Sequence, residues 1–112
     1  MNSRQKGAAG EREFRDQLRA AGYMSARRGQ QFSGGSDSPD VVCEELGGIH
    51  WEVKRVERLN IEDAIAQAIR DAGSCKTPIV AHRKNRGEWL ATVRLDDLFK
   101  LLRDGLDGLR LG

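Results

Sequence analysis

The sequence predicts a mixed α/β fold in which helices pack on a small central β-sheet. Segments 3–21 and 61–72 repeat apolar residues at helical spacing. Residues 49–56 alternate apolar and polar side chains as a half-buried strand does. A strand, a helix and a strand succeed one another across 49–82, which implies a parallel, right-handed crossover within an otherwise antiparallel sheet. The full predicted order is α-β-β-β-α-β-β-α.

In the N-terminal half, the first helix has one apolar face and ends at a glycine. We expect a short strand over 23–27 and a polar loop, rich in glycine and serine, over 28–39. Residues 40–45 then form a strand, a two-glycine turn reverses the chain, and 49–56 form the next strand.

In the C-terminal half, an asparagine followed three residues later by an aspartate indicates the start of a helix over 60–73. Strands over 77–82 and 88–93 flank a basic turn. A short helix over 95–103 completes the fold, and the glycine-rich tail at 104–112 is expected to fray.

Length and composition favour one soluble domain covering residues 1–112. Hydrophobic residues make up 38% and charged residues 32% of the chain, which argues against a disordered tail and a membrane protein. The N-terminus lacks the apolar stretch of a signal peptide, so we expect a cytoplasmic protein. Cys43 and Cys75 lack the spacing of a zinc site or disulfide framework, and Cys43 is expected in the core.

The charges are unevenly distributed along the chain. Residues 37–72 contain nine acidic and four basic side chains, whereas residues 1–36 and 73–94 are net basic. This pattern fits a metal-binding centre inside a surface that grips phosphates. It fits a solvated surface of mixed charge equally well.

The strand at 49–56 carries the most informative polar residues. Alternation places His50, Glu52 and Lys54 on the face opposite the apolar residues. Asp40 opens the preceding strand directly after a proline, and the hairpin can bring it beside Glu52. Two carboxylates at one place repel each other, and a divalent cation relieves that repulsion. The alternative is a surface strand with a Glu–Lys pair and an aspartate at a turn.

A third acid lies on the first helix. Glu11 shares the apolar face with Phe14, so we expect a partner for it, either Arg12 or a metal-bound water network. Glu13 lies about 200° away around the helix and is expected to face solvent. The alternative is that Glu11 is a surface acid at the edge of the apolar stripe.

Four sequence elements resemble the archaeal-type Holliday junction resolvases of the PD-(D/E)xK nuclease superfamily. They are KGAAGER (6–12), a short strand ending in Arg27, PDVV (39–42) and WEVK (51–54), with a serine- and glycine-containing loop before the third. The resemblance covers roughly residues 4–100 and implies a restriction-endonuclease-like core. Small phage-type nucleases of the superfamily share this core.

The resemblance implies a set of catalytic and metal-binding residues. Glu11, Asp40 and Glu52 would be the acids that bind Mg²⁺, with Mn²⁺ expected to substitute, and Lys54 would be the catalytic lysine. The family acts as a homodimer that cuts two opposed strands of a four-way DNA junction. The residues expected to contact DNA are Lys6, Arg12, Arg27, Arg28, Ser33, Ser36, Arg83, Lys84 and Arg86.

Several of these assignments have a simpler alternative. The basic turn at 83–86 grips phosphate or merely keeps the hairpin soluble. Gln67 is expected to be an exposed helix former rather than a residue of the site. His50 contacts DNA or the metal shell, or is a surface histidine. Trp51 and Trp89 alternate with apolar residues and are expected in the core.

The sequence therefore predicts a metal-dependent, structure-selective DNA endonuclease that resolves four-way junctions in DNA recombination and repair, in a prokaryotic or phage-infected cell. One alternative is another PD-(D/E)xK nuclease acting on duplex or single-stranded DNA. The other is a DNA-binding module without catalytic activity.

Overall fold

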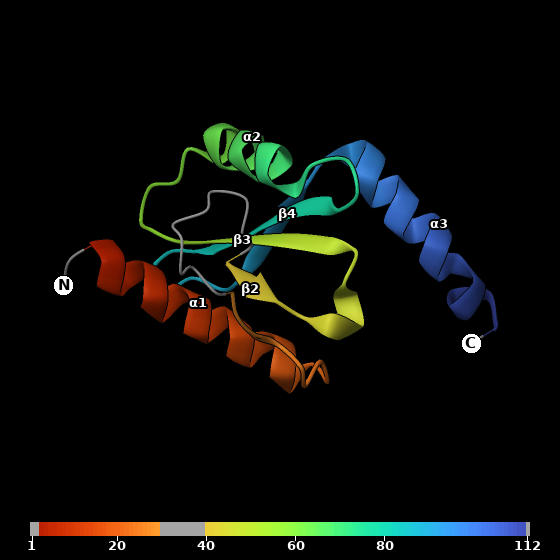
Figure 1. Ribbon diagram of the computed structural model, residues 1–112, viewed down its shortest axis with the longest axis horizontal. Coiled ribbons are helices and arrows are strands. Elements are labelled where there is room, and N and C mark those ends of the chain that lie inside the picture. Colours follow the sequence, from red (N-terminus) through yellow and green to blue (C-terminus); the bar gives the residue numbers. More distant parts are fainter. Residues whose placement is uncertain (1–2, 30–39, 112) are drawn as a thin grey trace.

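The computed structural model describes residues 3–29 and 40–111, with side chains described for 7–29 and 40–105. Two helices cover opposite faces of a five-stranded sheet and a third extends away from it (Figure 1). The predicted mixed α/β fold is confirmed. The elements are α1 (Ser3–Ala20), β1 (Arg27–Arg28), β2 (Val41–Val42), the 3₁₀ turn η1 (Glu44–Leu46), β3 (Ile49–Arg55), α2 (Ile61–Ala72), β4 (Thr77–Arg83), β5 (Leu90–Val93) and α3 (Leu95–Leu111).

The strands lie in the order β1-β2-β3-β4-β5. All neighbours are antiparallel except β3 and β4, which are parallel and are connected through α2. The predicted crossover is therefore confirmed. The parallel register places Arg55 beside Arg83 at the ends of the two strands. Strand β3 is the central strand: β4 pairs with it along its whole length, and β2 pairs with it at Trp51 on the other side.

Several element boundaries differ from the predictions; β5, for example, begins at Leu90 rather than at 88, and three differences are larger. The strand expected at 40–45 is reduced to Val41–Val42, because the Glu44 N–H turns away to donate to the Ser25 hydroxyl, at 2.8 Å. The strand expected at 23–27 begins only at Arg27. Helix α3 continues to Leu111 instead of ending near 103 and fraying. The loop expected over 28–39 lies mostly outside the described residues.

The main core lies between α1 and the sheet. Phe14 packs against Trp51 with the ring centroids 4.9 Å apart and against Trp89 at 5.3 Å. Cys43 is buried in the same cluster, and both tryptophans pack there. The predictions for Cys43 and the tryptophans are therefore confirmed. This core holds α1 on the face of β3 opposite to that of Glu52.

The second face of the sheet is covered by α2. The Asn60 side chain caps this helix by accepting the Asp63 N–H at 3.1 Å, as predicted. Ala64 and Ala68 pack on Val80 of β4, and alanine side chains this small let the helix lie close to the sheet. Helix α2 therefore runs directly over the face of β3 that carries the polar residues.

No helix within residues 3–29 and 40–111 is long and apolar enough to cross a membrane.

Helix α1 approaches β3 closely at a glycine. A Cβ atom added to Gly10 would lie 2.9 Å from Cβ of Arg55, closer than two carbon atoms can pack. At Gly7, one turn earlier on the helix, an added Cβ meets nothing within 4 Å. Gly10 therefore sets the distance between α1 and β3 next to Glu11.

We predict that Gly10→Ala destabilises the protein, because α1 must move away from β3 to admit the methyl group. Gly7→Ala is the matched control, and it should stabilise the helix by up to about 1 kcal/mol through propensity alone. Thermal melting of both variants measures the difference. Equal stabilisation by the two substitutions would contradict the close approach at Gly10.

Candidate active site

Asp40 is fixed to the edge of β3 by its backbone and by its side chain. Its N–H donates to the Trp51 carbonyl at 3.0 Å, and its carboxylate accepts the Val53 N–H at 2.8 Å. Along the edge of β3 that faces β2, the Val53 N–H is the next hydrogen-bond donor after the Val41–Trp51 pair. The Asp40 carboxylate accepts this bond where β2 ends, and so takes the place of a further β2 residue. The carboxylate therefore lies level with Glu52 and Lys54 of β3.

The charges of two other acids act on the Asp40 carboxylate. The pKa of Asp40 is raised to about 7, chiefly by burial and also by the carboxylates of Glu52 and Glu11, while the Val53 hydrogen bond and Lys54 oppose the rise. The hairpin places the Asp40 carboxylate on β3 next to Glu52, as expected, and the metal-binding role of the three acids stays a prediction.

Glu11 is buried, but its partner differs from the one expected. Its carboxylate lies 3.0 Å from Nε of Arg28 on β1, whereas Arg12 is exposed. The Arg28 guanidinium is therefore paired with a site residue rather than turned wholly toward solvent. This pair compensates for burying the Glu11 carboxylate on the apolar face of α1.

The expectation that Glu13 faces solvent is wrong. Its carboxylate lies 3.1 Å from the guanidinium groups of both Arg55 and Arg83. These arginines are neighbours in the parallel register and both lie on the α1 side of the sheet. One carboxylate between them attracts both guanidinium groups and so offsets their mutual repulsion. Arg83, which was expected to contact DNA, is thus used within the fold.

Two further residues hold the Glu52 side chain. His50 is 1% exposed, and its Nε2 atom lies 3.2 Å from a Glu52 carboxylate oxygen, so the alternative of a surface histidine is wrong. Asp71 of α2 lies beside this pair, with a carboxylate oxygen within 4.8 Å of ligand atoms of His50 and Glu52. Although burial alone would raise it, the pKa of Glu52 is lowered by its interactions with His50 and Asp71. Burial and the contact with Glu52 raise the pKa of Asp71, which favours Asp71 as the carboxyl that keeps the proton.

Asp71 was not predicted from the sequence. The available signal was its spacing, since Asp71 follows Gln67 by one helical turn on the side of α2 that faces the sheet. Gln67 is itself half-buried, and its side-chain oxygen lies 3.5 Å from Nζ of Lys54. The expectation of an exposed Gln67 is therefore corrected. Helix α2 therefore contacts both the Glu52 carboxylate, through Asp71, and the Lys54 ammonium group, through Gln67.

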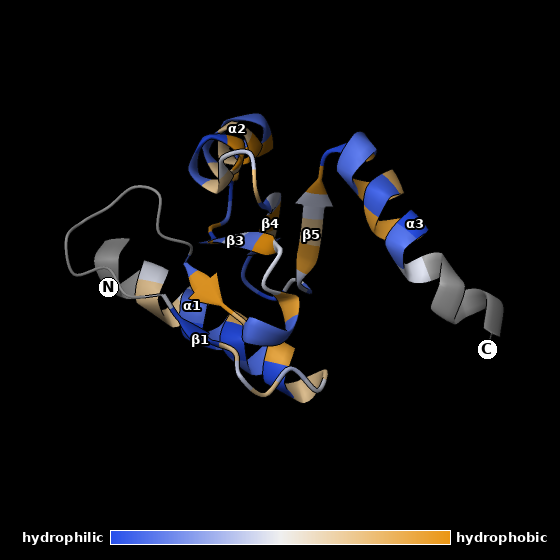
Figure 2. Ribbon diagram, turned by 45° about the vertical axis from the view of Figure 1, so that its right-hand side comes forward, coloured by the Kyte–Doolittle hydropathy of each residue, from blue (hydrophilic) through white to orange (hydrophobic). Residues whose placement is uncertain are grey.

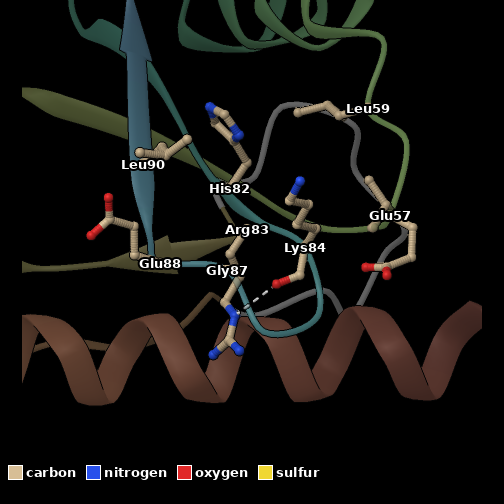
Figure 3. Close-up of a pocket in the computed structure, with 9 residues that line it drawn as sticks. Glu57, Leu59, His82, Arg83, Lys84, Gly87, Glu88 and Leu90 are labelled. Atoms are coloured by element: carbon tan, nitrogen blue, oxygen red, sulfur yellow. Dashed lines mark hydrogen bonds between the residues drawn. The ribbon is translucent and has the colours of Figure 1, made fainter.

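Two hollows open beside these residues. One, of about 280 Å³, is lined by Lys54 and Gln67 among others. The other, of about 380 Å³, lies next to it, since both share Val56 and Leu59. Figure 3 shows that Arg83 points toward α1 while the Lys84 side chain points the opposite way, toward His82 and Leu59. Burial lowers the pKa of His82 in this second hollow.

The remaining residues expected to contact DNA are only partly described. Arg12, Arg27, Lys84 and Arg86 are exposed, and Arg27 lies 3.6 Å from the Glu44 carboxylate. The side chain of Lys6 and both loop serines, Ser33 and Ser36, lie outside the described residues.

The donor set fits a divalent cation. Carboxylate oxygens such as those of Asp40, Glu52 and Glu11 are the hard ligands that Mg²⁺ prefers. Burial raises the pKa of Asp40 most, and the carboxylates of Glu52 and Glu11 add to the rise, an effect that a bound cation would offset. His50, Glu52 and Asp71 form an adjoining group whose ligand atoms lie within 4.8 Å of one another.

The model of a family described as "Phage putative PDDEXK endonuclease" matches residues 2–108. The chain belongs to this family. Pro39 and Asp40, followed by Glu52 and Lys54, match the letters of the PD…ExK motif. The superfamily to which the sequence was likened is thereby confirmed, and this phage endonuclease family implies a DNA substrate and the use of divalent metals. No curated protein and no solved structure matches the chain.

We predict that Asp40→Asn raises the melting temperature of this PDDEXK protein at pH 8, but not at pH 4, in metal-free buffer. The folded pKa of about 7 lies above the ordinary 3.8, so the wild type loses stability as the pH rises between these values. The loss is up to about 4 kcal/mol, and an amide avoids it. Asp16→Asn, at an exposed carboxylate, is the control. An equal shift at both pH values would contradict the assignment.

We also predict that Glu13→Gln lowers the melting temperature by about 5 °C, since two partly exposed ion pairs together contribute about 1 kcal/mol. The loss should shrink at high salt. A double-mutant cycle with Arg83→Gln should give a smaller loss than the sum of the single substitutions. Additive effects would show that Glu13 and Arg83 act independently.

Proposed function

We propose that the chain is a Mg²⁺-dependent, structure-selective endonuclease that resolves four-way DNA junctions as a homodimer in recombination and repair. The observation that carries the proposal is the convergence of Asp40, Glu52 and Glu11 beside Lys54. The family match supports nuclease activity, and the KGAAGER element supports the narrower resolvase assignment. In this proposal residues 1–112 act as a single nuclease domain in the cytoplasm of a prokaryotic or phage-infected cell.

Each residue of the site has a separate role in this proposal. Asp40, Glu52 and Glu11 hold the Mg²⁺ ion, for which Mn²⁺ substitutes. The bound cation supplies Lewis-acid chemistry, which lowers the pKa of water and offsets phosphate charge. Lys54 donates a hydrogen bond from Nζ to the nucleophile or to the scissile phosphate, and so stabilises charge that develops during attack.

Residues around the acids keep this geometry in place. His50 and Asp71 contact the Glu52 carboxylate and hold it in one orientation, as residues around metal ligands commonly do. Gln67 restrains the Lys54 side chain from α2. The catalytic groups are therefore held by a central strand and a packed helix, which limits the reorganisation needed during the reaction.

Contacts with DNA are proposed to be made through the phosphates. Arg12, Arg27, Lys84 and Arg86 are exposed and suited to the backbone of the substrate. Lys6, Ser33 and Ser36 complete the proposed set. Binding of this kind is independent of sequence and weakens steeply with salt.

A four-way junction has two-fold symmetry, and paired cuts require two equivalent sites. One chain of this size offers one such site, so two copies related by a two-fold axis supply the pair. The second candidate function is cleavage of duplex or single-stranded DNA. The description of the matching family favours it, since that description names an endonuclease without a branched substrate.

We predict that the wild type with Mg²⁺ makes symmetric paired cuts in a labelled four-way junction and cuts duplex, flap and single-stranded controls more slowly. Asp40→Asn, Glu52→Gln and Glu11→Gln should each lower the cleavage rate at least about tenfold while junction binding persists, since each removes a proposed metal ligand and keeps its shape. Mapped cut sites and single-turnover rates measure both effects.

Matched substitutions at exposed acids, Asp16→Asn and Glu62→Gln, serve as controls and should cut at wild-type rates. Equal cleavage of the junction and the linear duplex would favour the second candidate function. Failure of the wild type to cut any of these DNAs would identify a binding module without catalytic activity.

A further inference from the structure

Helix α3 receives little support from the rest of the fold. Among the described side chains, Leu101 is the α3 residue that packs against the core. Figure 2 shows the helix extending away from the sheet, with apolar residues in the part next to β5. Its 17 residues span about 25 Å, and helices of this length in water are stabilised mainly by packing an apolar face. An additional packing partner is therefore expected.

Within residues 95–105, the large apolar residues that α3 exposes form one continuous stripe. At about 100° per residue they fall within an arc of roughly 100° on the helix. Their exposed fractions are large for leucine and phenylalanine: Leu95 62%, Leu98 38%, Phe99 48% and Leu102 45%. An exposed stripe of this kind marks an interaction surface.

The charges beside the stripe indicate which partner fits. Asp96 and Arg103 are exposed and lie on the same flank of the stripe, two turns apart. An antiparallel second copy would place each Asp96 opposite Arg103 of the other copy, with Phe99 near the centre. A parallel copy would place this charged flank against Leu101 and Gly105, which carry no charge.

We propose that α3 pairs antiparallel with α3 of a second copy of this chain, about a two-fold axis near Phe99. The pairing buries the stripe Leu95, Leu98, Phe99 and Leu102 and forms two Asp96–Arg103 ion pairs. It specifies a surface for the homodimer of the proposed function and rests on that homodimer. Because the patch is small for a protein–protein interface, the dissociation constant is expected in the micromolar range.

The first test is sedimentation velocity of the full chain, without DNA, from about 1 to about 200 µM. The wild type should show a monomer–dimer equilibrium, and Phe99→Glu should raise the dissociation constant at least about tenfold. Met24→Glu is the matched control, since Met24 is also a large apolar residue and is even more exposed, at 67%, but lies outside α3. Melting curves establish that each variant is folded. A dimer that survives Phe99→Glu overturns the proposed surface.

The second test exchanges the charges. Asp96→Arg or Arg103→Asp alone places like charges opposite each other, and each should weaken self-association several-fold. An equimolar mixture of the two variants restores both opposite-charge contacts, so heterodimers should form with near wild-type affinity. The double substitution should also restore self-association. Absence of this rescue, despite weakening by the single substitutions, overturns the antiparallel arrangement.

These measurements contain no cleavage step, so their failure is separate from failure of the nuclease proposal. A strict monomer up to about 200 µM would overturn both the surface and the unassisted homodimer. It would leave the metal-dependent cleavage test unaffected.

Discussion

The hydrogen bond from the Val53 N–H to the Asp40 carboxylate is the contact on which the arrangement of the site depends. It satisfies a backbone donor where the short β2 strand ends, so the sheet needs no further strand residue there. It also fixes a carboxylate beside Glu52, from one face of the sheet, and Glu11, from a helix on the other. The site therefore lies beside β3, just past the end of β2, where side chains from both faces of the sheet can meet.

The spacing of α2 matches the spacing of the β3 motif. Gln67 and Asp71 are four residues apart, which is about 6 Å along a helix. Glu52 and Lys54 are two residues apart, which is about 6.6 Å along a strand. Because helix and strand run in opposite directions, Asp71 meets Glu52 and Gln67 meets Lys54. One rigid helix thereby holds both functional side chains of the strand.

Local patterns predicted much of this architecture. Alternation along β3 assigned Glu52 and Lys54 to one face, and the Asn60 cap located the start of α2. Contacts between distant segments were not predictable in the same way. The helix phase separated Glu11 from Glu13 correctly, but it contained no information on arginines from β3 and β4 that reach around to Glu13. The support of Glu52 by Asp71 likewise depends on how α2 crosses the sheet.

The ion pair between Glu13 and Arg83 joins residues 70 positions apart in the chain. The contact of Phe14 with Trp89 spans a still longer separation. Helix α1 is thus synthesised first, yet its inner face finds these partners only when β4 and the following turn have been made. Contacts between residues so far apart in sequence slow folding, because a long loop must close before they form. During synthesis, the helix that carries Glu11 can therefore pack fully only after most of the chain has been made, and the site is completed late in folding.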